Sequence, residues 1–160
     1  MMRIGIISDT HGLLRPDAIE HLAGSDYIIH AGDIGAPAVI DRLRGIAPTT
    51  AIRGNVDAGA WANEYPDTEI VVLSGRTFYV LHNLNEIDVD PAASGINVVV
   101  SGHSHRPKIE TKDGVLYINP GSAGPRRFKL PIALACLTIS DRRIVPQILE
   151  IAPDVVRVHL

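Results

Sequence analysis

The amino-terminal third of the chain alternates short apolar runs with amphipathic segments that begin at proline. Residues 3–7, 27–30 and 49–52 are apolar runs too short for helices and typical of strands buried on both faces. Between them, residues 16–24 and 37–45 each begin with proline and carry apolar side chains at helical spacing. Repetition of strand and helix in this order predicts a parallel sheet covered by helices.

The remainder of the chain is richer in strands. Residues 96–101 form another buried apolar run, residues 155–159 are expected to add an edge strand, and residues 56–67 are the longest irregular stretch. Three pairs of strand-like segments separated by short turns predict hairpins: 69–73 with 77–82, 108–112 with 115–118, and 132–139 with 143–150. We therefore predict an α/β fold in which two sheets pack face to face, with helices on the outside.

The length and composition fit one globular domain that spans residues 1–160. Apolar residues make up 46% and charged residues 21% of the chain, which is ordinary for a globular protein. A single cysteine excludes a disulfide-rich secreted fold and a multi-cysteine zinc site. The formal net charge of −3 argues against a general nucleic-acid binder, and no duplex nucleic acid is expected as a partner.

The sequence indicates neither a membrane span nor a signal peptide. No apolar run approaches the roughly 20 residues needed to cross a bilayer. Residues 4–7 are the only apolar or glycine stretch before Ser8, whereas a signal peptide needs an apolar core of about 7–15 residues. We therefore expect a cytoplasmic protein that does not contact membranes.

Polar side chains follow the predicted strands at the points where the strands end. Ligands bind at the carboxyl ends of strands in sheets of this kind. The side chains are carboxylates, one amide and imidazoles, and they belong to Asp9, His11, Asp33, Asn55, His82, His103 and His105. Such oxygen and nitrogen donors suit Mn, Fe, Zn or Ni better than Ca. Seven ligands are too many for one tetrahedral ion and suit two ions, with one carboxylate bridging both.

The spacing within two of these motifs supports a shared site. Asp9 and His11 are two residues apart, as are His103 and His105. Side chains two apart in an extended chain point the same way, so each pair is expected to converge on one point.

The motifs at these strand ends resemble those of a known family, the calcineurin-like metallophosphoesterases. The matching segments, in order, are Asp9-Thr10-His11, Gly32-Asp33, Gly54-Asn55-Val56-Asp57, His82 and Gly102-His103-Ser104-His105. A further segment, Asn119-Pro120-Gly121-Ser122, resembles a signature of the small bacterial and archaeal phosphodiesterases that have no cap over the site. The resemblance implies an αββα sandwich of two mixed sheets flanked by helices.

The resemblance also implies a role for each ligand. One ion would be held by Asp9, His11 and His105, the other by Asn55, His82 and His103, with Asp33 bridging them. Catalytic roles would fall to Asp33, Asn55 and His103. The implied cofactor is a pair of divalent ions, manganese first, with nickel, zinc and iron as alternatives. Two ions about 3.5–4 Å apart can hold a bridging hydroxide for in-line attack on phosphorus.

Further residues are expected around this centre. Asn55 and Arg126 would contact the phosphate of the substrate, Arg126 through its guanidinium. His30 and Asp57 would lie behind the ligands and support them. The expected substrate is a phosphate-ester small molecule or a nucleotide. Trp61 would either cover the substrate or lie at a contact between copies in a homo-oligomer.

Two departures from the family pattern bear on the reaction. Many larger relatives carry a histidine after the Gly-Asn pair and the small subfamily often carries cysteine, whereas this chain has Val56. Valine can neither donate nor accept a proton, so we expect slow turnover or a preference for activated leaving groups. The usual His-Gly-His of the family is His82-Asn83-Leu84 here, which keeps the predicted ligand and changes the loop that follows it.

We therefore expect a dinuclear metal-dependent phosphoesterase that acts on phosphodiesters. One alternative is a protein-interaction scaffold, because a eukaryotic retromer subunit has a similar fold and serves that role. The complete ligand set favours the enzyme, whereas Val56 is compatible with the scaffold. A second alternative, a metal-dependent nuclease, is disfavoured by the negative charge and the lack of a basic groove.

Overall fold

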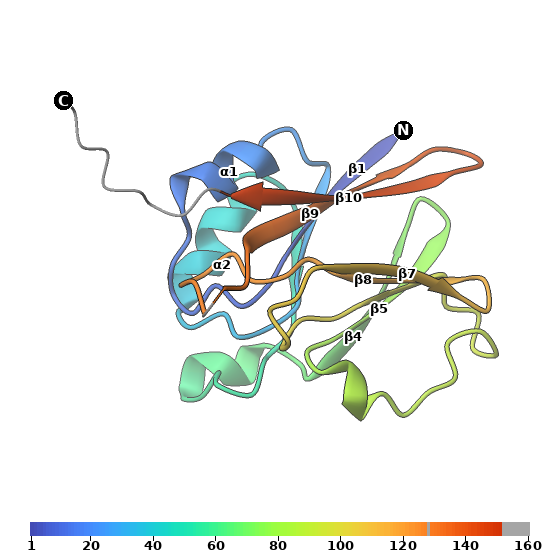
Figure 1. Ribbon diagram of the computed structural model, residues 1–160. Helices are drawn as coiled ribbons and strands as arrows, with labels where there is room; N and C mark the ends of the chain where they lie inside the picture. Colours follow the sequence, from blue (N-terminus) through green and yellow to red (C-terminus); the bar gives the residue numbers. More distant parts are fainter. Residues whose placement is uncertain (128, 152–160) are drawn as a thin grey trace.

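The computed structural model describes residues 1–127 and 129–151, which form two sheets of five strands each, packed face to face (Figure 1). The first sheet has the order β10 (Ile144–Ile151), β9 (Ile132–Ile139), β1 (Met2–Ile7), β2 (Tyr27–His30) and β3 (Thr49–Ala51). The second has the order β4 (Thr68–Leu73), β5 (Arg76–Leu81), β6 (Val98–Val100), β8 (Val115–Asn119) and β7 (Lys108–Lys112). The predicted α/β fold with two sheets is confirmed. The predicted edge strand over residues 155–159 lies outside the described residues.

Parallel pairing places the ends of the site-bearing strands together. In the first sheet β1 pairs in parallel with β2, and β2 with β3. In the second sheet β6 lies between β5 and β8 and is parallel to both. The antiparallel neighbours β9, β10, β4 and β7 complete two mixed sheets. Since parallel strands end at the same edge, the loops that follow β1, β2 and β3 open on one side of the sheet.

The two α-helices of the described residues both cover the outer face of the first sheet (Figure 1). They are α1 (Pro16–Leu22) and α2 (Pro37–Arg44), and each starts with proline, which fits the first helical turn because its missing N–H has no partner there. Leu22 and Ile40 are buried against the strands in one apolar cluster. The predicted helices are therefore confirmed, with α1 ending two residues early.

The outer face of the second sheet has a different cover. Residues 83–97 cross it, and Ile87 and Ile96 of this segment pack against Tyr79 and Val99. The regular part of the segment is one 3-10 turn, η2 (Leu84–Glu86). The stretch 56–67, expected to be irregular, likewise contains a 3-10 helix, η1 (Ala60–Glu64). Both turns are too short for the sequence periodicity to reveal.

The main core lies between the sheets. Alternate residues of β1, Ile4 and Ile6, face Phe78 and Val80 of β5, and none of the four is exposed. This alternation follows from the period of two in a strand, which sends Ile7 to the opposite face, where it packs with the helices. No helix in the described part of the chain is long and apolar enough to cross a membrane.

Loss of the largest inter-sheet side chain should test this core. We expect Phe78→Ala to lower the free energy of unfolding by about 3–5 kcal/mol, because it removes a buried ring and leaves a cavity. The control is Ile70→Ala on the adjacent β4, since Ile70 is 57% exposed. It should change stability by less than about 0.5 kcal/mol. Denaturant unfolding measures both, and equal losses would contradict the assignment of the core.

Candidate metal centre

Side chains from four strand ends gather in one cluster. Asp9 and His11 follow β1, Asp33 follows β2, His82 follows β5 and His105 follows β6. Ligand-type atoms of three side chains all lie within 4.8 Å of one another in two groups, which are Asp9, His11, His105 and Asp9, Asp33, His82. Because the groups share Asp9, the cluster offers two adjacent places for a cation.

The distances place the two carboxylates at the middle of the cluster. Asp9 Oδ1 is 3.2 Å from His105 Nε2 and 4.0 Å from His11 Nε2. His82 Nε2 is 3.2 Å from Asp33 Oδ2 and 3.8 Å from Asp9 Oδ1. Asp33 Oδ2 is also 3.8 Å from His11 Nε2. Both carboxylates therefore face imidazoles of both groups.

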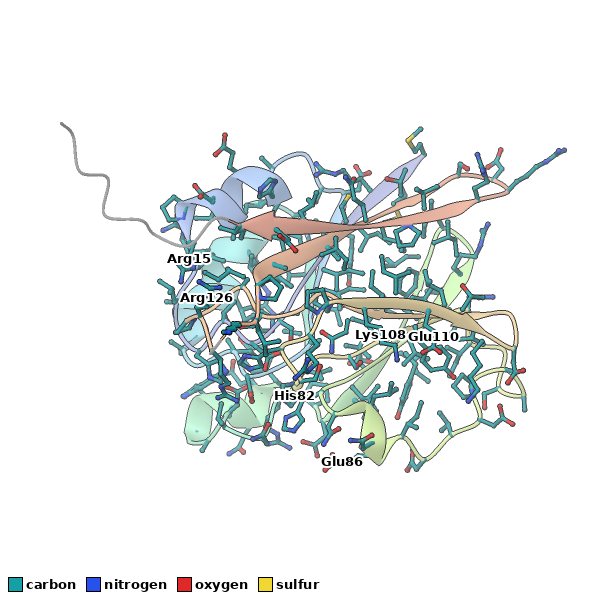
Figure 2. The ribbon with its side chains drawn as sticks, viewed as in Figure 1. Arg15, His82, Glu86, Lys108, Glu110 and Arg126 are labelled. Carbon is teal, nitrogen blue, oxygen red and sulfur yellow. The ribbon has the colours of Figure 1, made fainter. Side chains whose placement is uncertain are left out.

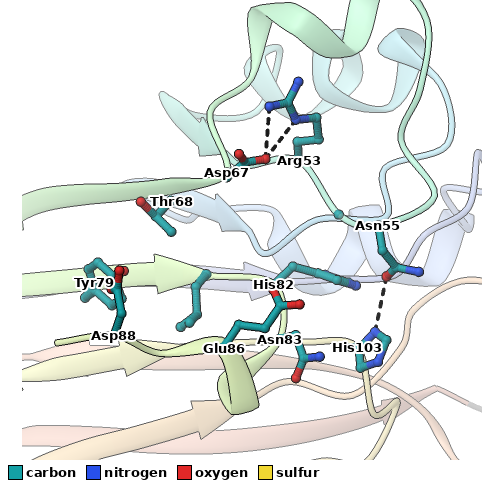
Figure 3. Close-up of a pocket in the computed structure, with 12 residues that line it drawn as sticks. Arg53, Asn55, Asp67, Thr68, Tyr79, His82, Asn83, Glu86, Asp88 and His103 are labelled. Carbon is teal, nitrogen blue, oxygen red and sulfur yellow. Dashed lines mark hydrogen bonds and ion pairs between the residues drawn. The ribbon is translucent and has the colours of Figure 1, made fainter.

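Asn55 and His103 form a pair beside the cluster. Asn55 Oδ1 lies 3.2 Å from His103 Nδ1, and the imidazole of His103 stands edge-on to that of His82 with 5.2 Å between ring centres (Figure 3). Both residues of the pair are exposed, whereas His82 is buried. The pair therefore forms the solvent side of the second group.

The backbone at the ligands is mostly in the left-handed region. Five of the seven expected ligands have positive φ: Asp9 (55°), His11 (48°), Asp33 (55°), His103 (68°) and His105 (60°). The extended backbone assumed for the two pairs is therefore wrong. Asp9 and His11 nevertheless converge in one group as predicted, whereas His103 lies outside the group that contains His105. A non-glycine residue in this region costs on the order of 1–3 kcal/mol when held there, and such residues cluster at functional sites.

Hydrogen bonds orient the ligand atoms. His82 Nδ1–H donates to the carbonyl of Ala31 at 2.8 Å, which leaves the lone pair of Nε2 facing the carboxylates. Asp9 Oδ2 accepts from the Ser8 hydroxyl at 2.6 Å and from the backbone N–H of His103 at 3.1 Å. Asp9 Oδ1 is thereby left to face the imidazoles. Ser8 was not anticipated from the sequence, because a serine beside an aspartate carries no signal of its own.

Several buried ligand atoms make no hydrogen bond with any described residue. They are Asp9 Oδ1, His11 Nε2, His82 Nε2 and His105 Nδ1. A buried polar atom without a partner costs roughly 1–3 kcal/mol, more if it is charged, so four at one place call for an explanation. Divalent cations would satisfy Asp9 Oδ1, His11 Nε2 and His82 Nε2, and His105 faces the same place with its Nε2 rather than its Nδ1. Carboxylate with imidazole donors fits transition metals. The residues present therefore fit the metal pair that the motifs imply.

The electrostatics of the cluster also favour a bound cation. Burial opposes the charged form of His82, but the Asp33 and Asp9 carboxylates outweigh it and raise the pKa of His82. Burial raises the pKa of Asp33, yet His82 and the backbone N–H of Val56 stabilise the carboxylate and lower the pKa to about 2. The Asp33 carboxylate thus remains ionised at neutral pH and favours positive charge beside it.

Asp57 ties together two of the loops that carry ligands. Its carboxylate accepts backbone N–H bonds from Ile34 at 3.0 Å, Gly35 at 2.9 Å and Gly54 at 2.9 Å. These amides belong to the loops after β2 and β3, which carry Asp33 and Asn55. Asp57 therefore supports the site from behind, as expected, through the backbone of both loops.

His30 is a buried neutral imidazole behind the cluster. Its Nδ1 accepts the N–H of Gly32 at 3.1 Å, so Nε2–H donates to the Thr10 hydroxyl at 2.9 Å. The Thr10 hydroxyl in turn donates to the carbonyl of Ile34 at 2.9 Å. Burial without an acidic partner at hydrogen-bond distance lowers the pKa of His30 to about 4. The imidazole therefore links the loops after β1 and β2 without carrying charge.

Two glycines permit close approach of these loops. A Cβ at Gly54 would collide with the backbone N and the carboxylate of Asp33, and a Cβ at Gly102 would collide with Ser8 Oγ and the Asp9 carboxylate. Neither position can accept a side chain while the ligands stay in place.

The Asn119–Ser122 turn supports the loops that carry the ligands. Asn119 Nδ2 donates to the carbonyl of Gly102 at 2.9 Å, and its Oδ1 accepts from the N–H of Gly121 at 2.9 Å. The buried Ser122 hydroxyl donates to the Asp9 carbonyl at 3.0 Å. The turn therefore positions the loops of Asp9 and His103, and the Ser122 hydroxyl does not face a substrate.

A cavity of about 520 Å³ opens beside the Asn55–His103 pair (Figure 3). Its other polar walls come from Arg53, Asp67, Asn83, Glu86 and Asp88. Arg53 Nε donates to Asp67 Oδ1 at 3.0 Å, so its charge is matched. Arg53 directly precedes the Gly54-Asn55 motif but was not predicted from the sequence. The acidic residues of the cavity lie too far along the chain for their spacing to indicate them.

Arg126 and Trp61 are not among the residues that line this cavity. The guanidinium of Arg126 donates to the carbonyl of Leu130 on its own loop at 3.3 Å. Figure 2 shows Arg126 toward the helix-bearing side of the molecule, with Lys108 and Glu110 on the other side of His82. Trp61 packs edge-on to Tyr65, with ring centres 6.2 Å apart, in the cluster beneath the helices. The structure therefore does not bring Arg126 to this cavity, and its contact with the phosphate stays a prediction.

Comparison with known proteins identifies the family. Residues 2–142 match the calcineurin-like phosphoesterase superfamily domain. The chain belongs to this superfamily. A probable metallophosphoesterase of Methanocaldococcus jannaschii is 31% identical to this phosphoesterase over an alignment 153 residues long, which covers 88% of this chain and 78% of the relative. The family expected from the motifs is thereby confirmed.

Solved structures share the fold of this calcineurin-like phosphoesterase. An archaeal phosphodiesterase superposes with a TM-score of 0.77 at 26% identity, over 92% of this chain and all of that one (100%). Vps29 of Entamoeba histolytica, solved in complex with zinc, superposes with a TM-score of 0.72 at 16% identity, over 93% of this chain and 99% of that one. The second likeness shows the fold alone.

The buried His30 should make stability depend on acid. The unfolded chain takes up a proton at this imidazole below about pH 6.5, and the folded chain does so only below about pH 4. Folding stability therefore falls as the pH drops from 6.5 to 4, by a total on the order of 3 kcal/mol from this group.

The comparison variant is His30→Gln, which keeps an acceptor and a donor but cannot titrate. Chemical denaturation at pH 7 and pH 5 should show a smaller loss of stability in the variant than in the wild type. An identical loss in both would show that His30 is not the responsible group.

Proposed function

We propose that this protein is a dinuclear metal-dependent phosphodiesterase. The observation that carries the proposal is the set of buried carboxylate and imidazole atoms, Asp9 Oδ1 and His82 Nε2 among them, that have no hydrogen-bond partner among the described residues. Because the chain belongs to a phosphoesterase superfamily, we infer that these unsatisfied atoms serve the hydrolysis of a phosphate ester. The archaeal relative of the same fold, named a phosphodiesterase, supports diesters as substrates.

Each ligand has a part in holding the metal pair. Asp9, His11 and His105 would hold one ion, and His82, His103 and Asn55 the other, with Asp33 between them. When bound, divalent ions activate water and withdraw charge from the phosphoryl group. We propose manganese first, with nickel, zinc and iron as the other candidates for this donor set.

The Asn55–His103 pair would position the phosphoryl group. His103 Nδ1–H donates to Asn55 Oδ1, which leaves the lone pair of His103 Nε2 for a cation and the Asn55 amide N–H groups for a phosphoryl oxygen. Both side chains are exposed to the cavity, so an ester can reach them directly. The ionised carboxylate of Asp33 faces His82, whose imidazole stands edge-on to that of His103.

Metal-dependent hydrolysis tests this proposal. The purified protein should hydrolyse bis(p-nitrophenyl) phosphate with added Mn²⁺, and a chelator should abolish the reaction. Asp33→Asn and His103→Ala should each lower kcat/KM roughly 100-fold or more, because each removes a few kcal/mol of transition-state stabilisation. Metal analysis should find two ions per wild-type chain.

The control is His21→Ala on α1, which removes an imidazole that is not part of the cluster. It should leave both activity and metal content unchanged. Two bound ions with no hydrolysis of any ester would contradict the enzyme and favour the protein-interaction scaffold.

The residue beside the pair predicts which leaving groups are accepted. Val56 is 50% exposed next to Asn55, and its backbone N–H donates to Asp33 Oδ1 at 3.0 Å. Its side chain offers no proton to a departing oxygen, so the wild type should favour p-nitrophenyl esters strongly over alkyl esters. Val56→His should raise kcat on the alkyl ester by up to about 100-fold, and on the p-nitrophenyl ester much less.

Val56→Leu serves as the matched control, because it changes the size of the side chain without adding a proton donor. Both variants keep the backbone N–H that contacts Asp33. If Val56→His raises both rates equally, the missing acid is not what limits the wild type.

A further inference from the structure

A second, smaller cavity lies on the other side of His103. It has a volume of about 230 Å³ and lies on the outer face of the second sheet, between η2 and strands β7 and β8. Asn83 and His103 line both this groove and the larger cavity. The groove is smaller than the roughly 300–1,000 Å³ that holds a whole drug-sized ligand, so it suits one substituent of a substrate.

The floor and one wall of this groove are apolar. Tyr117 on β8 is half-buried and packs with the apolar cluster of the outer face, and Leu84 on η2 is 38% exposed at the groove. Leu84 follows His82 by two residues and lines the groove together with His103. It therefore places an aliphatic side chain in the same groove as one member of the Asn55–His103 pair.

The charges around the groove are largely matched. Lys108 Nζ is 3.2 Å from Glu110 Oε2, and Figure 2 shows both on β7. The amide of Asn119 is fully occupied by the loops that it holds. Arg106 adds one positive charge at the rim. A group that enters the groove therefore meets little unpaired polar surface.

The larger cavity has the opposite character. Asp67, Glu86 and Asp88 bring three negative charges to it, whereas Arg53 brings one positive charge. An uncharged ring placed there would desolvate carboxylates and gain little. The same ring in the groove would cover Leu84 and Tyr117 and be stabilised by burial.

We propose that the groove of Leu84 and Tyr117 binds an uncharged aromatic substituent of the phosphate ester. The proposal rests on the proposed function, because the phosphoryl group must sit at the Asn55–His103 pair for its substituent to reach the groove. The substrate class is then a phosphodiester with at least one aryl or nucleobase-sized arm.

Binding of two phosphonates, each with one substituent, tests the groove without requiring turnover. Calorimetry on the Mn²⁺-loaded protein would compare phenylphosphonate with methylphosphonate. We expect phenylphosphonate to bind roughly 10- to 100-fold more tightly to the wild type. Leu84→Asn should reduce that ratio by about tenfold, because it replaces the apolar wall with an amide.

The matched control is Ile109→Asn on β7, which is 40% exposed and alternates with Lys108 and Glu110 along the strand. It should keep the wild-type ratio. Equal binding of the two phosphonates, or a ratio of their affinities that Leu84→Asn leaves unchanged, would contradict binding of the substituent in the groove. Neither result would contradict the proposed function. Failure of both phosphonates to bind would instead contradict the phosphoryl site itself, and the groove with it.

Discussion

The close approach of two buried carboxylates governs the rest of the structure. Asp9 is completely buried and Asp33 is 3% exposed, and like charges in such surroundings are unfavourable unless positive charge and donors face them. The groups that face them come from separate segments of the chain: the hydroxyl of Ser8 donates to Asp9, and the imidazoles of His82 and His105 lie 3.2 Å from Asp33 and Asp9 respectively. Both sheets must therefore end at the same place, and the sandwich provides that convergence.

A layer of groups that are not ligands keeps the loops in register. Asp57 binds amides of the loops after β2 and β3, and His30 links the loops after β1 and β2. Asn119, at the end of the neighbouring strand β8 of the same sheet, holds the loop of His103. These contacts are between protein groups alone, and they hold the loops that carry the ligands.

The sequence predicts the features that only a few residue types can provide. It does not predict contacts between residues that lie far apart along the chain. The strands and the seven strand-end positions followed from apolar runs and motif order, because a buried strand and a ligand leave little choice of side chain. The left-handed backbone at His103 and His105 did not follow, because spacing alone does not give φ. The place of Arg126 and the groove of Leu84 and Tyr117 depend on how a loop folds over a sheet, which local pattern does not specify.

The left-handed backbone at five ligands also limits how such a site can change over evolution. If valine, isoleucine or threonine replaced Asp9, His11 or Asp33, a metal-ligating atom would be lost. The branched side chain would also clash with the left-handed backbone. Glycine and asparagine tolerate the same backbone, so loss of the metal through those residues would leave the loops intact. A relative in which glycine or asparagine replaced these residues could therefore lose catalysis and still keep the surface of the fold.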